Sequence, residues 1–237
     1  MKVIGIIPAR YDSSRFPGKP LANILGKSMI ERVYEQCKKA SSLSDIIVAT
    51  DDQSILNHVQ SFGGEAMMTS KDHQSGTDRC NEVVRKLTEN YDVIVNIQGD
   101  EPYINPVQID EIIELFEEDK TQIGTLAKKI TDIEIIANEN SPKAIFDKNR
   151  IALNFCRNIA NISSECTYYK HIGIYAYRSE ILTKICALEQ SENEKRERLE
   201  QLRWLDNGYK IKVGITTFEA LAVDTPEDIE KIEQKMG

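Results

Sequence analysis

The first half of the chain alternates short apolar runs with longer segments in which apolar residues recur every three or four positions. Short continuous apolar runs are typical of strands in a parallel sheet, and the longer amphipathic segments are typical of helices. Strands are expected at residues 2–7, 46–50, 65–68 and 93–98, and helices at residues 28–40, 54–63, 78–89 and 107–118. This alternation predicts parallel βαβ units joined by right-handed crossovers.

The second half has a different order of elements. Strand-like runs follow one another without a helix between each pair, at residues 123–129, 144–147, 151–155 and 172–177. The polar run Asp147-Lys148-Asn149-Arg150 is typical of a hairpin turn. Helices are then expected at residues 179–188 and 194–206, a strand at 211–215, and a last helix from Thr225 onward. We interpret this half as a mixed-sheet insertion over the core rather than a separate domain.

Composition places the chain among soluble globular proteins. Hydrophobic residues make up 41% and charged residues 29% of the 237 positions, which excludes a disordered or fibrous chain. No apolar stretch approaches the roughly 20 residues that a membrane span needs, and the apolar run at the amino terminus is too short for a signal peptide. We therefore expect no membrane insertion and a cytoplasmic location. The 5 cysteines form no Cys-x-x-Cys pair, which favours reduced thiols over a disulfide framework or a structural zinc site.

Charge is distributed unevenly along the chain. The formal net charge is -8, which argues against indiscriminate nucleic-acid binding. Residues 1–40 nevertheless carry 8 Lys or Arg against 3 acidic residues, a local charge of +5. A basic amino-terminal segment on an acidic protein indicates a local anion-binding site.

Three polar loops, residues 8–20, 69–77 and 99–103, follow predicted strands. Because ligands of parallel sheets bind beyond the carboxyl ends of the strands, we expect these loops on one rim. The first loop carries three cations, Arg10, Arg15 and Lys19, which could neutralise a triphosphate, although a solvated basic loop fits equally well. It is neither a P-loop nor a dinucleotide motif, because its glycine spacing is wrong for both.

Carboxylates provide candidate metal ligands. Asp100 follows a predicted strand and could bind Mg²⁺ together with phosphate oxygens, although Gly-Asp is also a turn dipeptide. Asp224 is most simply a helix start, and it could share one Mg²⁺ with Asp100 if the chain folds back. The segment Asp72–Arg79 could read a base or phosphate, or cap a helix through Ser75 or Thr77. No nucleophile motif of the Gly-x-Ser-x-Gly type occurs.

Taken together, these motifs resemble the sugar-acid cytidylyltransferases, most closely the CMP-Kdo synthetases, which are 3-deoxy-manno-octulosonate cytidylyltransferases. Two stretches are specific to the Kdo branch, Asp-His-Gln-Ser-Gly-Thr and Leu-Glu-Gln-Leu-Arg. The matching segments span nearly the whole chain in the family's order: Ile6–Tyr11 with Arg15–Leu21, Ile47–Asp51, Asp72–Arg79, Val95–Pro102, Lys170–Arg178, Leu199–Arg203 and Val223–Asp228.

The resemblance implies a nucleotide-diphospho-sugar transferase fold, which is an α/β, Rossmann-like fold with a mixed central sheet and a small mixed-sheet insertion. It implies a single cytidylyltransferase domain over residues 1–237. About residues 1–120 would bind the nucleotide, and about residues 121–237 would bind the sugar acid and form a homodimer. The implied reaction joins CTP to a 2-keto-3-deoxy sugar acid and releases pyrophosphate, for lipopolysaccharide or capsule biosynthesis.

The resemblance also implies a role for each matching residue. Arg10 and Lys19 would hold the triphosphate, Ser75 and Gln98 would lie near the cytidine, and Arg15 would belong to the same nucleotide site. Asp100 and Asp224 would bind Mg²⁺. Catalysis would depend on Lys19, Asp100 and Arg10. The sugar acid would contact Arg157, His171, Tyr175, Glu200 and Gln201.

One segment departs from the family pattern. Residues Phe155–Ser163 lack the usual proline and second arginine, and the loop before Tyr168 is short. Because this region belongs to the expected sugar pocket, the acceptor stays open among Kdo, its 8-amino analogue and another keto acid of the nonulosonic type. An alternative to an enzyme is a protein that binds a nucleotide without turning it over. The joint presence of Arg10, Lys19, Asp100 and Asp224 favours the enzyme.

Overall fold

The computed structural model describes residues 1–12, 16–159, 162–163, 165–219 and 221–236. The chain forms two compact units, one of residues 1–110 with 220–237 and one of residues 111–219. The first unit therefore includes the carboxyl-terminal segment that carries Asp224. The single-domain organisation expected from the sequence stays a prediction.

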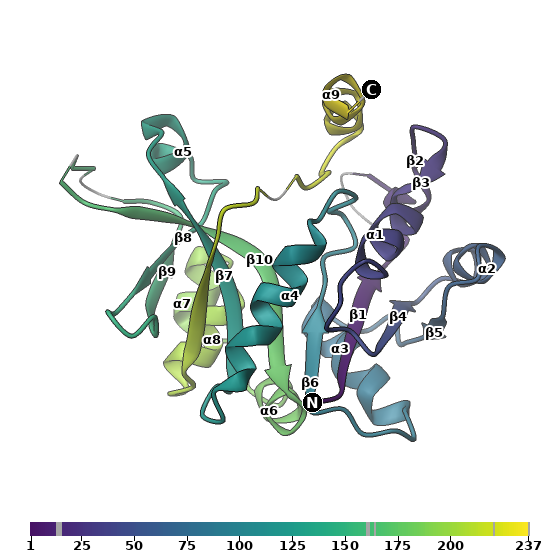
Figure 1. The fold of residues 1–237 in the computed structure, drawn as a ribbon, viewed down its shortest axis with the longest axis horizontal. Coiled ribbons are helices and arrows are strands. Elements are labelled where there is room, and N and C mark those ends of the chain that lie inside the picture. The colour runs from purple at the N-terminus through teal and green to yellow at the C-terminus, as the bar shows by residue number, and fades with distance from the viewer. Residues whose placement is uncertain (13–15, 160–161, 164, 220, 237) are drawn as a thin grey trace. The chain divides into compact units, whose positions relative to one another are not determined.

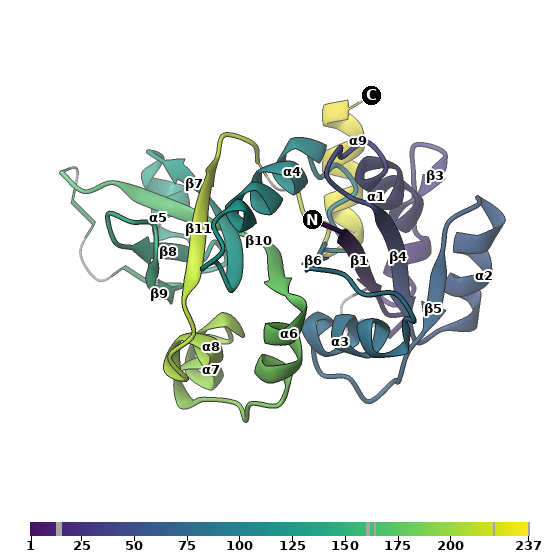
Figure 2. The ribbon, with the colours of Figure 1, turned by 60° about the horizontal axis from the view of Figure 1, so that its bottom comes forward.

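A parallel sheet forms the centre of the first unit, in the strand order β6-β1-β4-β5 (Figure 1). Every residue of β6 and nearly every residue of β1 is buried, which explains their continuous apolar sequences. In Figure 2, α1 and α3 lie on opposite sides of β1 and β4. The bounds are β1 (Val3–Ala9), β4 (Asp45–Thr50), β5 (Ala66–Met68), β6 (Val93–Asn96), α1 (Met29–Cys37), α2 (Gln53–Ser61) and α3 (Gly76–Lys86).

A short hairpin that the sequence pattern did not predict follows the first loop. Strands β2 (Asn23–Ile24) and β3 (Lys27–Ser28) pair across a tight turn, and Gly26 supplies a positive φ of 85°. The last helix, α9 (Pro226–Met236), belongs to the same apolar cluster as this hairpin. The buried members of this cluster are Ile24, Met29, Val223 and Ile232. The cluster anchors the segment that precedes α9.

The second unit contains the mixed sheet expected from the sequence. Strand β7 pairs antiparallel with β10 and parallel with β11, and β8 pairs antiparallel with both β9 and β10. The predicted turn at Asp147 is confirmed, because the Arg150 N–H donates to the Asp147 carbonyl at 2.9 Å between β8 and β9. The bounds are β7 (Ile123–Ile130), β8 (Lys143–Phe146), β9 (Ala152–Cys156), β10 (Tyr168–Arg178) and β11 (Ile211–Thr216).

The helices between residues 106 and 206 correct one prediction. The helix expected over residues 194–206 is two helices, because Arg198 adopts a left-handed conformation with a φ of 54°. Helix α4 and the following 3₁₀ turn occupy the range expected at 107–118. Among the described residues, no helix is long and apolar enough to cross a membrane. The bounds are α4 (Pro106–Glu114), η2 (Leu115–Glu117), α5 (Ile133–Ala137), α6 (Ser179–Cys186), α7 (Glu192–Glu197) and α8 (Gln201–Asp206).

Candidate active site

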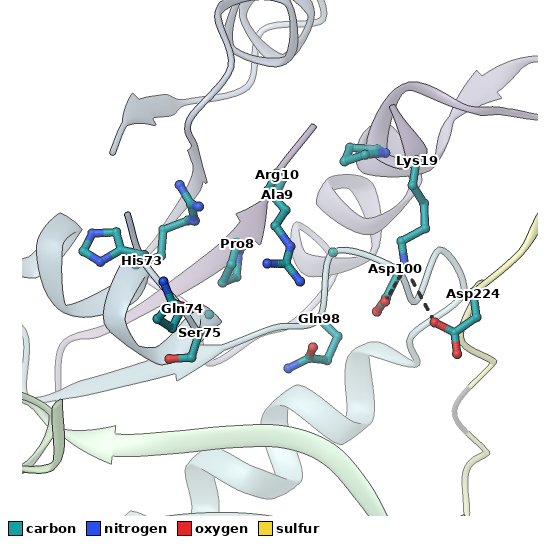
Figure 3. A pocket seen from close by; sticks show the side chains of 14 residues that line it. Pro8, Ala9, Arg10, Lys19, His73, Gln74, Ser75, Gln98, Asp100 and Asp224 are labelled. Atoms are coloured by element: carbon teal, nitrogen blue, oxygen red, sulfur yellow. Dashed lines mark hydrogen bonds and ion pairs between the residues drawn. The ribbon is translucent and has the colours of Figure 1, made fainter. Parts of the chain in front are cut away.

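A polar cavity of about 280 Å³ opens at the carboxyl ends of β1 and β6 in the first unit (Figure 3). All three loops predicted to share one rim contribute to its lining, so that prediction is confirmed. The cavity brings together most of the expected nucleotide and metal residues: Arg10, Lys19, Ser75, Gln98, Asp100 and Asp224. Arg15 lies outside the described residues.

Lys19 stands at the start of the 3₁₀ turn η1 (Lys19–Leu21). The preceding Gly18 has a φ of 70°, and its N–H donates to the Tyr11 carbonyl at 2.9 Å, so the loop folds back on itself. This fold turns the Lys19 side chain toward Asp100. The ammonium donates to Asp100 Oδ2 at 2.7 Å and lies 3.9 Å from Asp224 Oδ1.

Close backbone packing positions Asp100. A Cβ on Gly99 would lie 2.6 Å from the Pro8 carbonyl oxygen, so only glycine allows the two loops to approach this closely. On the other side, the Val223 N–H donates to the Asp100 carbonyl at 2.9 Å. These two contacts bring residues from three distant parts of the sequence together, and both aspartates meet one ammonium.

Arg10 follows β1 and is exposed. In Figure 3 the Arg10 guanidinium and the Gln98 amide extend into the same space, while Lys19 faces the two aspartates. Within the described part of the chain, Arg10 forms no ion pair. A cation in that state is available to an incoming anion.

Ser75 caps helix α3. Its hydroxyl donates to Asp78 Oδ2 at 2.9 Å and accepts from the Asp78 N–H at 3.1 Å, which is a capping box. Because a hydroxyl has one hydrogen and two lone pairs, one acceptor position is left for another partner. The capping prediction is confirmed, and the contact with the nucleotide stays a prediction.

Two ion pairs that the sequence prediction missed support the wall of this cavity. Arg79 is 3% exposed and donates to Asp51 Oδ2 at 2.8 Å and to Thr69 Oγ1 at 2.5 Å. Its position four residues after Ser75, on one helix face, was the available signal. Its partner Asp51 directly follows β4 of the same sheet, so the pairing depends on the tertiary fold.

The second of these pairs joins His73 to Glu82. Burial opposes ionisation of Glu82, but hydrogen bonds from Lys86, from the Ser70 N–H and from His73 together lower the pKa of this carboxyl to about 2. The ionised carboxylate can only accept, so His73 Nε2 donates to it. His73 is thereby held in the cavity lining.

His171 and Tyr175, both expected to contact the sugar acid, are buried on β10 in the second unit. Thr125 Oγ1 lies 2.9 Å from His171 Nε2, and the hydroxyl also donates to the Ile174 carbonyl at 2.8 Å. Burial lowers the pKa of His171 to about 3, so the ring is neutral at physiological pH. Burial, and then the charge of Glu200, raises the pKa of Tyr175. Both side chains therefore offer hydrogen bonds rather than charge.

Arg157 and Gln201 differ in how their donors are used. The Arg157 guanidinium donates to three backbone carbonyls, those of Glu197 at 2.7 Å, Glu139 at 3.1 Å and Arg198 at 3.3 Å. Gln201 is 2% exposed, and its Nε2 has no hydrogen-bond partner among the described residues. A buried donor without an acceptor is costly, so Gln201 is suited to a polar ligand. Arg157 holds surrounding backbone, and its predicted contact with the sugar carboxylate stays a prediction.

The donor set of Asp100 and Asp224 fits a magnesium ion. Two carboxylates that already share one cation can bind Mg²⁺, which takes one or two protein carboxylates and fills its remaining positions with phosphate oxygens and water. Clusters of three or more His, Cys, Asp or Glu side chains suited to a metal do not occur in the described part of the chain. The pair therefore fits a metal that arrives with a nucleotide.

Comparison with known proteins identifies the class. A cytidylyltransferase family model matches residues 4–211. A 3-deoxy-manno-octulosonate cytidylyltransferase of Parabacteroides distasonis is 54% identical over 244 residues, with 98% of this chain and 96% of the relative covered. A protein of the same name from Bacteroides thetaiotaomicron is 52% identical, with 99% and 98% covered. The fold and the matches define a nucleotidyltransferase of the cytidylyltransferase class.

A solved structure gives a more specific match. It is described as CMP:2-keto-3-deoxy-manno-octonic acid synthetase complexed with CTP, and it superposes with a TM-score of 0.94 at 38% identity, covering 100% of this chain and 98% of that chain. The chain belongs to the 3-deoxy-manno-octulosonate cytidylyltransferase family, the CMP-Kdo synthetases. The predicted α/β fold class and the predicted family are both confirmed.

Proposed function

We propose that this enzyme transfers the cytidylyl group of CTP to 3-deoxy-manno-octulosonate (Kdo), giving CMP-Kdo and pyrophosphate. The observation that carries the proposal is the convergence of Arg10, Lys19, Asp100 and Asp224 on one cavity of a chain that is 54% identical to a Kdo cytidylyltransferase. The related solved structure, described as complexed with CTP, supports the choice of nucleotide.

The reaction is a substitution at the α-phosphorus of CTP. The anomeric hydroxyl oxygen of the sugar acid forms the new P–O bond, the bond to the bridging oxygen of pyrophosphate breaks, and the hydroxyl proton is lost. Such a transfer asks the protein mainly for positioning and for charge neutralisation. The described residues of the cavity supply both, and no side chain is assigned as a general base.

Arg10 and Lys19 would neutralise the triphosphate and the leaving pyrophosphate. Arg10 is suited to this role because its planar fork can hold two phosphate oxygens and because it has no ion pair in the described structure. Lys19 supplies a compact ammonium that is already directed into the cavity. Ser75 and Gln98 would contact the cytidine from the same lining.

Asp100 and Asp224 would hold a magnesium ion, whose presence we include in the proposal. When bound, such an ion acidifies a coordinated hydroxyl and neutralises phosphate oxygens. The two carboxylates, which lie on the loop after β6 and on the segment before α9, would hold it at the cavity. Their orientation is maintained by the Gly99–Pro8 approach and by the Val223 hydrogen bond.

The sugar acid would be recognised by side chains of the second unit. Gln201 has a buried donor available, and neutral His171 and Tyr175 supply further hydrogen bonds. Gln201, His171 and Tyr175, together with Glu200 and Arg157, are the residues predicted to contact the sugar acid. We further propose that the enzyme works in the cytoplasm as a homodimer, in lipopolysaccharide or capsule biosynthesis.

Pyrophosphate release with a panel of acceptors tests this proposal. The purified enzyme is assayed with CTP, with and without Mg²⁺, against Kdo, 8-amino-Kdo and a nonulosonic acid. We expect turnover with Kdo that requires Mg²⁺, and formation of CMP-Kdo by mass spectrometry. Turnover with only the nonulosonic acid contradicts the acceptor, and CTP binding without product for any acceptor contradicts the enzyme activity.

A matched pair of variants localises the activity to the cavity. Asp100→Asn removes one carboxylate charge and is expected to lower kcat roughly a hundredfold or more, because it removes preorganised electrostatic stabilisation. Asp12→Asn changes an exposed carboxylate that does not line the cavity and is expected to keep wild-type turnover. Both variants are expected to retain the native circular dichroism spectrum. Near-wild-type turnover of Asp100→Asn would refute the role of Asp100.

A further inference from the structure

The Lys19 ammonium joins three segments of the first unit that are far apart in the sequence. It donates to Asp100 Oδ2 at 2.7 Å and lies 3.9 Å from Asp224 Oδ1 (Figure 3). It also donates to the Val223 carbonyl at 2.9 Å. The Lys19 side chain is only 14% exposed, whereas those of Asp100 and Asp224 are 30% and 48% exposed. The least exposed member of this group is therefore the cation.

Counting donors shows how far the protein engages Lys19. A lysine ammonium has three N–H donors and no acceptor. Two of the three are given to Asp100 and to Val223, and the remaining charge faces Asp224. The third N–H can meet a triphosphate oxygen, while the two protein partners hold the ammonium beside the carboxylates.

The same carboxylates are the ones that fit a divalent cation. Asp100 Oδ2 accepts the short hydrogen bond from Lys19, so a metal ion bound at this oxygen would meet the ammonium as a neighbouring like charge. Repulsion between an ammonium and a divalent ion a few ångströms apart is strong at the partly buried edge of a protein. Lys19 and the metal ion therefore exclude each other at this pair.

We propose that Lys19 is the resident counter-ion of the Asp100–Asp224 pair, that it competes with the divalent cation for these carboxylates, and that it moves to the triphosphate as metal and nucleotide bind together. This inference rests on the proposed function. It assigns Lys19 a second role: the metal alone binds weakly, and the nucleotide strengthens metal binding by drawing the ammonium away. Linkage requires the metal to strengthen nucleotide binding by the same factor.

The backbone on both sides of the carboxylate pair is also held by contacts that do not involve Lys19. The Val223 N–H donates to the Asp100 carbonyl, and the Val223 side chain is fully buried in the apolar cluster beneath α9. The N–H groups of Asp224 and Thr225 both donate to Asp228 Oδ2 at 3.1 Å. Replacing Lys19 by an uncharged residue should therefore leave both aspartates in place and remove the Lys19 charge from them.

Metal binding by the nucleotide-free enzyme tests the proposal. Mn²⁺ is titrated into wild-type enzyme and into Lys19→Met, with free Mn²⁺ measured by electron paramagnetic resonance. We expect Lys19→Met to bind Mn²⁺ about tenfold more tightly or better, because a unit charge about 4 Å away is removed. The matched control is Lys27→Met, which loses a lysine paired with Glu31 and Glu35 outside the cavity and should bind Mn²⁺ as the wild type does.

Three outcomes overturn the competition. Unchanged or weaker Mn²⁺ binding by Lys19→Met does so directly. The second outcome is tighter Mn²⁺ binding that persists when Asp100→Asn and Asp224→Asn are added to Lys19→Met, because the metal then binds elsewhere. The third is a Lys19 ammonium resonance, observed by NMR of the ¹⁵N-lysine-labelled wild type, that stays unchanged at saturating Mg²⁺. This last measurement uses the wild-type enzyme, so it tests the proposal even if Lys19→Met does not fold.

These measurements use neither a sugar acid nor turnover. Absence of product with every acceptor would refute the proposed reaction while leaving the Mn²⁺ affinities interpretable. Conversely, equal Mn²⁺ affinities would refute the counter-ion role while leaving a normal rate of pyrophosphate release with Kdo. The two failures are therefore distinguishable.

Discussion

At the scale of single residues, protonation in the second unit is set by burial. His171 packs edge-on against Phe155, with ring centroids 4.9 Å apart, and beside Tyr175 at 5.4 Å. In this apolar surrounding the charged imidazolium is disfavoured, so the pKa of His171 falls to about 3. A neutral imidazole held by Thr125 offers a fixed pattern of hydrogen bonds to a ligand.

The low pKa of His171 predicts a pH dependence of stability. Between pH 6.5 and about 3 the unfolded chain binds a proton at this histidine and the folded chain does not, so stability falls as pH is lowered through this window. The contribution is up to about 1.4 kcal/mol per pH unit. Urea unfolding of wild type and of His171→Asn at pH 6.5 and pH 4.5 measures it. We expect a smaller pH-dependent loss in the variant, and equal losses would contradict the neutral buried ring.

Some site residues could be predicted from the sequence, and others could not because their role depends on a partner residue that only the fold brings near. Arg10 and Asp100 could be proposed from sequence, because a charged residue close behind a buried strand of a parallel sheet lies at the ligand-binding edge. Lys19 could be proposed because it belongs to the polar loop after the same first strand. The supporting contacts of His73 and Arg79 could not, since Glu82 and Asp51 meet them only after the loops fold. The engagement of Arg157 by backbone carbonyls was equally invisible in the sequence.

At the scale of elements, α7 and α8 are joined by a buried ion pair. Arg203 on α8 holds both carboxylate oxygens of Glu194 on α7, at 2.7 and 2.6 Å, and both side chains are less than 10% exposed. The run Glu192–Arg198 has the sequence of a solvated helix face, but its Glu194 is buried. Arg198, with its left-handed backbone, turns the chain between the two helices, and this turn allows Glu194 and Arg203 to pair.

Glu194→Ala is expected to lower the free energy of unfolding by about 3–5 kcal/mol, because it takes the Glu194 carboxylate away from the buried Arg203 charge. Glu192→Ala, on the same helix with a 90% exposed side chain, is expected to change it by less than about 0.5 kcal/mol. Chemical denaturation of both variants measures the difference. Equal stability of the two variants would contradict the structural role of the buried pair.

The long amphipathic helices and buried strands were predicted correctly, because their periodicity extends over several turns or a whole strand. Strands β2 and β3 contain two residues each, too few to produce a pattern, and they were missed. The break between α7 and α8 was missed because a non-glycine residue with positive φ leaves no mark in composition. Local pattern therefore predicted the elements but not the irregular backbone between them.

At the scale of the whole molecule, the first unit is built from both ends of the chain. Residues 220–237 return to residues 1–110, and this return carries Asp224 to Asp100. The sequence could suggest this closure only through family resemblance, because spacing alone places no constraint on two aspartates separated by more than a hundred residues. The apolar cluster of Ile24, Val223 and Ile232 now supplies the physical reason.

A crystal structure of the enzyme with CTP and Mg²⁺ tests whether these residues form one nucleotide site. We expect the triphosphate in the cavity against Arg10 and Lys19, with a magnesium ion bound by Asp100 and Asp224 and the Lys19 ammonium displaced from both carboxylates. A nucleotide bound outside this cavity, or a metal ion that contacts neither aspartate, would contradict this expectation.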